Sequence, residues 1–116
     1  MIQVATVLFV LAALGGLTMV GIRLRGAPRP PTWLALGHGA LAVTALGMLL
    51  YCATVGIPLY SQIALGIFVL AAMGGIFIFL TYHMQQRPLP IPLILGHGAL
   101  AIAGIVLLLI DLFSAA

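Results

Sequence analysis

The sequence predicts an all-α integral membrane protein, an antiparallel bundle of four transmembrane helices made from a tandem duplicated helical hairpin. Three observations lead to this fold class. Apolar residues make up 65% of the 116 residues and charged residues only 4%, whereas about a quarter of a soluble domain is charged. The apolar residues fall into long runs, and the second half of the chain repeats the first. A chain with a mean hydropathy of +1.37 cannot cover a water-facing surface.

Each apolar run is long enough for a transmembrane helix, which needs about 20 apolar residues. The expected spans are Ile2–Ile22, Thr32–Thr54, Leu59–Tyr82 and Pro92–Phe113. Proline-bearing segments separate these spans at residues 23–31, 55–58 and 83–92. Proline ends helices because it lacks a backbone donor and restricts the residue before it. We therefore expect four helices in an up-and-down order.

The arginines indicate how the helices are oriented. Arg23, Arg25 and Arg29 lie in the first connection, and Arg87 lies in the third. The positive-inside rule places both connections in the cytoplasm, with the second connection and both termini on the periplasmic side of a bacterial inner membrane. The net charge of +3 is too small and too localised to indicate nucleic-acid binding. The one acidic residue, Asp111, is expected to be solvated at the outer end of its helix.

Residues 1–57 and 60–116 align without a gap at an offset of 59 positions. The segment 36–43, Leu-Gly-His-Gly-Ala-Leu-Ala-Val, returns at 95–102 as Leu-Gly-His-Gly-Ala-Leu-Ala-Ile. Because each repeat crosses the membrane twice, both copies keep one orientation, related by a pseudo-two-fold axis along the membrane normal. We expect one four-helix domain that contains two copies of one hairpin.

This repeat places His38 and His97 at the same membrane depth. Counted from the arginine-bearing connections, both lie about 10–12 Å into the membrane, as do paired glycines on the facing helices. An ionisable group at this depth indicates a functional site. The glycines that we expect to line this site are Gly15, Gly16, Gly37, Gly39, Gly74, Gly75, Gly96 and Gly98.

Two imidazoles on diagonal helices suit one planar metal macrocycle held from both faces. In a bundle with short connections, the second and fourth helices lie on a diagonal, which spans roughly 11–14 Å when neighbouring axes are about 8–10 Å apart. Imidazole ligates haem iron, and the lack of a Cys-x-x-Cys-His motif leaves a b-type haem. The glycines would let the ring edges approach the backbone, and Arg23, Arg25, Arg29 and Arg87 could pair with the haem propionates.

These features resemble those of the b-type membrane cytochromes, among them the cytochrome b561-type four-helix bundles and the haem-bearing membrane anchors of quinone-linked dehydrogenases. The resemblance covers the architecture of the whole chain and includes no specific family motif. It implies that His38 and His97 are the axial ligands of one haem. The chain would then be an electron-transfer subunit without substrate turnover, working with other redox subunits or with quinone. Cytochrome b561-type proteins usually have two histidine pairs, whereas this chain offers one.

Other interpretations of the same residues stay open. Membrane helices use small residues to pack closely and histidine to hydrogen-bond across helices, so the chain could be a cofactor-free structural or assembly subunit, or a homo-oligomer. A quinone or pigment at each histidine is a third interpretation. Zinc is disfavoured because it takes three or four protein ligands. His83 is expected to face water or lipid headgroups, and no catalytic motif predicts an enzyme.

Overall fold

A computed structural model of the chain describes residues 1–114, which form four long helices and no strand. The helices are α1 (Ile2–Leu24), α2 (Thr32–Val55), α3 (Leu59–Ile78) and α4 (Ile91–Ser114), and a short π-helical segment, η1 (Phe79–His83), extends α3. Each helix, with η1 counted as part of α3, is long and apolar enough to cross a membrane. The prediction of an all-helical fold with four such helices is confirmed.

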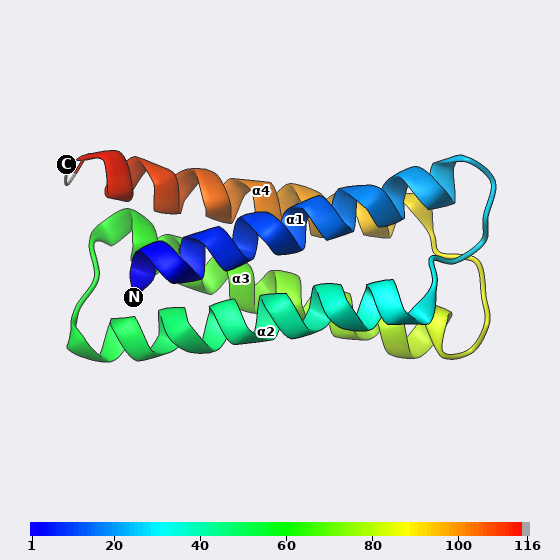
Figure 1. Cartoon of the computed structure of the whole chain (residues 1–116), viewed down its shortest axis with the longest axis horizontal. Helices are drawn as coiled ribbons and strands as arrows, with labels where there is room; N and C mark the ends of the chain where they lie inside the picture. Colours follow the sequence, from blue (N-terminus) through cyan, green and yellow to red (C-terminus); the bar gives the residue numbers. More distant parts are fainter. Residues whose placement is uncertain (115–116) are drawn as a thin grey trace.

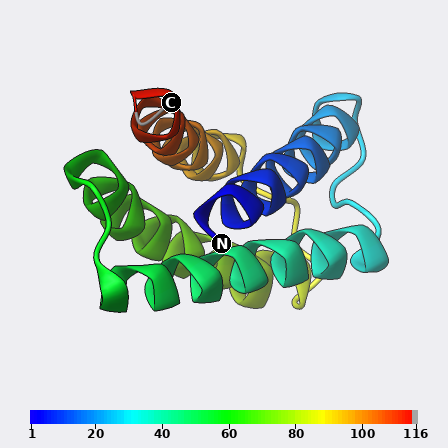
Figure 2. The ribbon, with the colours of Figure 1, turned by 60° about the vertical axis from the view of Figure 1, so that its left-hand side comes forward.

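The helices run up and down, and the start of α1 and the end of α4 lie at the same end of the bundle (Figure 1). The molecule measures 43 × 22 × 21 Å, so its long axis follows the helices. Helix α1 packs against α2 and α4, and α3 packs against the same two helices, as Figure 2 shows for α1. The pairs α1/α3 and α2/α4 are therefore diagonal, and residues on them meet through side chains.

The connections at the other end of the bundle are joined to each other. The amide of Leu89, which precedes α4, donates a 3.0 Å hydrogen bond to the carbonyl of Pro28, which precedes α2. Arg23 Nε, at the end of α1, donates to the Leu89 carbonyl at 2.9 Å. These bonds tie the two hairpins together where the arginines lie.

Prolines fix where three helices begin. Pro31, Pro58 and Pro90 directly precede α2, α3 and α4, and their carbonyls accept the first backbone hydrogen bonds of these helices. A helix cannot extend backwards through them, because proline favours extended backbone before it and lacks an amide donor. Gly56, which ends α2, has a φ of 104°, a conformation that is unstrained for glycine.

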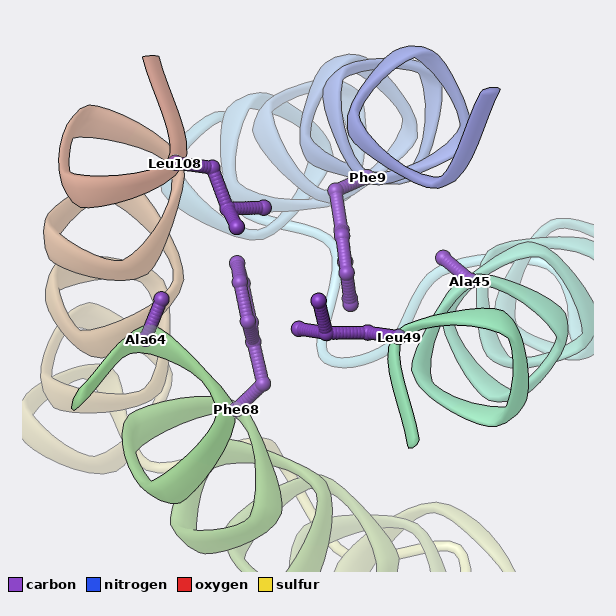
Figure 3. Close-up of a cluster of buried hydrophobic side chains, with 6 residues drawn as sticks. All are labelled: Phe9, Ala45, Leu49, Ala64, Phe68 and Leu108. Carbon is purple, nitrogen blue, oxygen red and sulfur yellow. The ribbon is translucent and has the colours of Figure 1, made fainter. Parts of the chain in front are cut away.

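The core is built from residues at matched positions of the two repeats. The rings of Phe9 on α1 and Phe68 on α3 stack with centroids 3.7 Å apart, and Leu49 and Leu108 lie on either side of them (Figure 3). Helices α2 and α4 also begin and end 59 positions apart. Residues that match in the sequence alignment therefore occupy equivalent places in the bundle.

The repeats differ where α3 begins. Asp111 of α4 is half-buried and accepts two hydrogen bonds from Ser61, one from its amide at 2.6 Å and one from Oγ at 2.8 Å. The expectation of a solvated carboxylate is wrong, because Asp111 satisfies donors that the first turn of α3 leaves without a helical partner. Its charge is also favourable at the positive end of the helix dipole. The matched positions hold Cys52 and Ile2, which cannot form this bond.

Substitution of Gly104 of α4 tests how tightly the aromatic core is packed. An added Cβ would lie 2.6 Å from Cζ of Phe68, and this ring cannot retreat because it stacks on Phe9. We expect Gly104→Ala to destabilise the protein by about 1–3 kcal/mol, measured as a lower thermal unfolding midpoint in detergent. The control is Gly47→Ala, where a Cβ would meet nothing within 4 Å and should leave the midpoint unchanged or higher. Equal midpoints for the two variants would contradict this packing.

Candidate functional site

His38 of α2 and His97 of α4 face each other across the bundle. Their ring centroids are 6.1 Å apart and their planes are inclined at 73°. Since α2 and α4 lie on a diagonal, the two side chains span the space between the helices. Both residues are half-buried. The structure thus brings the two histidines into one place in the interior of the bundle.

The two imidazoles differ in their hydrogen bonds. Nδ1 of His38 lies 2.7 Å from the carbonyl oxygen of Ala12 on α1. A carbonyl only accepts, so in the neutral ring Nδ1 carries the proton and Nε2 keeps a free lone pair. Nδ1 of His97 is buried and has no hydrogen-bond partner among residues 1–114, so the bond between His38 and Ala12 has no counterpart at this ring. A buried polar atom without a partner costs about 1–3 kcal/mol.

Glycines of the neighbouring helix leave room for each ring. A Cβ on Gly16 would lie 3.2 Å from Cε1 of His38, and a Cβ on Gly75 would lie 2.9 Å from Cε1 of His97. The adjacent Gly15 and Gly74 are in looser contact, at 3.9 Å from the same two side chains. The structure therefore gives these four glycines a direct role, since each pair accommodates the imidazole of its own hairpin.

The glycines beside the histidines on their own helices lie in open surroundings. A Cβ on any of these four residues would meet nothing within 4 Å; they are Gly37, Gly39, Gly96 and Gly98. Gly37 lines a shallow groove of about 460 Å³ on the surface of α2. Trp33 and Thr44 line the groove together with His38, so the His38 side chain borders the outer surface of the bundle as well as its interior.

The four arginines gather at the end of the bundle where the two hairpins are tied together. The side chain of Arg23 forms one of the hydrogen bonds that join the hairpins. The guanidinium of Arg87 lies over the ring of Tyr82, 4.6 Å from its centroid. The side chains of Arg25, which is exposed, and Arg29, which is half-buried, form no hydrogen bond with residues 1–114. The arginines are thus divided into two that bind the protein and two that are available to a ligand.

The burial of His83 differs from the sequence-based prediction. It was expected to face water or headgroups, but only 8% of its surface is exposed. Its ring stacks on Phe79 with centroids 5.0 Å apart, and its Nε2 lies 3.0 Å from Oγ1 of Thr32 on α2. The π-helical turn that ends at His83 brings it to α2, and nothing in the apolar pattern marks such a turn. The matched residue, Leu24, is exposed.

No group of three or more His, Cys, Asp or Glu side chains that could hold a metal ion occurs within the described residues. The central pair therefore offers two protein ligands. This number is too small for a structural or catalytic zinc site, which takes three or four.

Substitution of Gly75 tests how closely the imidazole of His97 packs against this glycine. In Gly75→Ala the new Cβ would displace the imidazole, at a rotamer cost of about 0.5–1.5 kcal/mol that the higher helix propensity of alanine, about 1 kcal/mol, offsets. We therefore expect little change in stability but a clear change in the ring resonances of His97 in histidine-selective NMR. Gly74→Ala, with ordinary contact at 3.9 Å, should leave the resonances in place. If both variants behave alike, His97 is not seated against Gly75.

Comparison with known protein families, with curated proteins and with solved structures finds no match for this chain. The residues of the chain itself define the candidate site. These are a facing pair of imidazoles in the middle of the bundle and a cationic end about two helical turns away along α2.

Proposed function

We propose that the chain is a small membrane cytochrome in which His38 and His97 ligate one b-type haem. It passes single electrons as a subunit of a larger respiratory or dehydrogenase complex. The facing imidazoles carry this proposal. Their ring centroids lie 6.1 Å apart, so these two side chains are the residues that would hold the haem iron.

The hydrogen bond of His38 also suits iron ligation. A metal-ligating histidine usually donates its other ring N–H to a carbonyl or a carboxylate, which fixes the ring. The Ala12 carbonyl serves His38 in this way and would leave Nε2 for the metal, whereas Nδ1 of His97 has no such partner within the described residues. A haem iron needs only its axial ligands from the protein. A bis-histidine haem takes two, and His38 and His97 are two.

Apolar layers close the site on both sides. The stacked Phe9 and Phe68 lie towards the termini, and a buried cluster of Ile78, Leu89 and Ile94 lies towards the arginines. When bound, the haem would supply one-electron redox chemistry. The chain's own contribution is to hold the two imidazoles and to exclude water, and low-dielectric burial with bis-histidine ligation would set the reduction potential.

The absorption spectrum tests this function. We expect protein purified in mild detergent, from cells supplied with ample haem, to show a sharp low-spin b-type change on reduction with dithionite. A pyridine haemochrome assay should give close to one haem per chain. A flat visible spectrum would contradict the proposal, and colour without a pyridine haemochrome would indicate a pigment instead.

A cofactor-free structural subunit is the second candidate, and one observation favours it. The imidazoles already fill the spaces beside Gly16 and Gly75, and His38 bonds across helices to Ala12. Such an interhelical bond contributes about 0.6–2 kcal/mol in a membrane. A flat spectrum, together with a lower unfolding midpoint for His38→Ala, would support this candidate.

We also propose that the two hairpins arose by duplication and that the chain lies in a bacterial inner membrane. The matched positions of the repeats support the duplication. All four arginines lie at one end, and Asp111, the one acidic residue, lies at the other. The positive-inside rule then puts the arginine-bearing connections in the cytoplasm and both termini in the periplasm.

Reporter fusions test the orientation. We expect alkaline phosphatase fused to the C-terminus to be active, because this enzyme folds only in the periplasm. Green fluorescent protein fused at the same point should stay dark, because it does not mature after export. The reverse pattern would contradict the orientation.

A further inference from the structure

A second polar cluster, distinct from the His38–His97 pair, lies at the arginine end of the bundle. It consists of Arg29 in the first connection, Thr32 at the start of α2 and His83 at the end of η1. Oγ1 of Thr32 lies 3.0 Å from Nε2 of His83, and the Arg29 guanidinium lies within electrostatic range of the same ring. Three separate elements therefore bring a guanidinium, a hydroxyl and an imidazole into one small group.

His83 is held in a fixed position within this cluster. It is 8% exposed, and its ring lies parallel to that of Phe79, with an interplanar angle of 16°. It ends the π-helical segment η1, and short π-helical segments are frequent at functional sites. A polar side chain that is this well buried needs fixed partners, and Thr32 occupies only one of its nitrogens.

The cluster lacks a counter-charge from the protein. The chain has one acidic residue, Asp111, which is bound to Ser61 at the opposite end of the bundle. The Arg29 side chain forms no hydrogen bond with residues 1–114. A guanidinium beside a histidine, without any carboxylate, leaves this place with an unbalanced positive potential.

The start of α2 adds to this potential. The Pro31 carbonyl accepts the amides of Leu34 and Ala35, which leaves the amides of Thr32 and Trp33 at the open end of the helix. The N-terminus of a long helix carries a partial positive charge and binds anions. Thr32 thus lies where the helix dipole and the charge of Arg29 both favour an anion.

We propose that Arg29, Thr32 and His83 form a binding site for one oxyanion group at the membrane surface. A carboxylate or a phosphate has the required charge and acceptor oxygens. Two sources supply this chemistry: a haem propionate, or the phosphodiester of an anionic phospholipid. Thr32 precedes His38 by six residues, about 9 Å along the helix. The propionate source rests on the proposed function, whereas the phospholipid source does not.

A haem titration tests the propionate source. Haem-free protein in detergent is titrated with haem b and with haem b dimethyl ester, whose carboxylates are blocked. If a propionate fills the site, Arg29→Gln and His83→Gln weaken binding of haem b by about tenfold or more and leave binding of the ester unchanged. Gln85→Ala, an exposed residue of the same end outside the cluster, is the matched control and should bind both like the wild type.

Native mass spectrometry tests the phospholipid source, with phosphatidylglycerol and phosphatidylcholine as probes. If a lipid phosphate fills the site, the wild type retains phosphatidylglycerol in preference. The cluster variants lose most of this preference, and Gln85→Ala keeps it. Thr32→Val removes one hydroxyl without a change in charge or volume. It is the variant to use if the others fail to fold, and it distinguishes a site from general charge attraction.

The outcomes separate this proposal from the proposed function. If the wild type binds no haem, the cytochrome proposal fails, and the lipid measurement alone decides on the oxyanion site. If the cluster variants match Gln85→Ala with haem b, with the ester and with phosphatidylglycerol, the oxyanion site is overturned. This result would leave the haem ligands His38 and His97 untouched.

Discussion

In the membrane location that we propose, buried polar groups have to find their partners within the protein, and the polar contacts of the bundle lie in three layers. Near the termini, the Asp111 carboxylate closes the start of α3. In the middle, His38 meets a carbonyl of the neighbouring helix. At the arginine end, Thr32 meets His83. Apolar layers separate these three levels, so each polar contact is isolated and has few alternatives.

His97 is the exception among these buried polar groups. It matches His38 in the repeat and has the same glycine support, but its Nδ1 is buried without a hydrogen bond within the described residues. A purely structural role explains His38, whose bond to Ala12 joins α1 and α2. It explains His97 less well, because an unpaired nitrogen destabilises the packing that it should support. The haem that we propose would give both histidines the same task through Nε2, and it would leave Nδ1 of His97 without a partner.

The helices, their order and the shared depth of the histidines could be predicted from the sequence. The lengths of the apolar runs, the positions of the prolines and the repeat can all be identified in it directly. The rotation of each helix about its axis could not, since these helices are apolar on all sides and no amphipathic face marks the interior. For this reason the sequence left Asp111 and His83 at the surface. The imidazole-sized spaces beside Gly16 and Gly75 were missed for the same reason, although the glycines themselves were found.

The central claim is that His38 and His97 share one ligand, and the haem-to-protein ratio of single variants tests it most directly. His38→Ala and His97→Ala are purified beside Gly47→Ala, whose site lies away from the pair. If one haem bridges the two rings, each histidine variant loses essentially all of the bis-histidine absorbance, and Gly47→Ala keeps the wild-type ratio. If each histidine variant retains about half of the pigment, the histidines serve separate ligands, and the shared site described above is wrong.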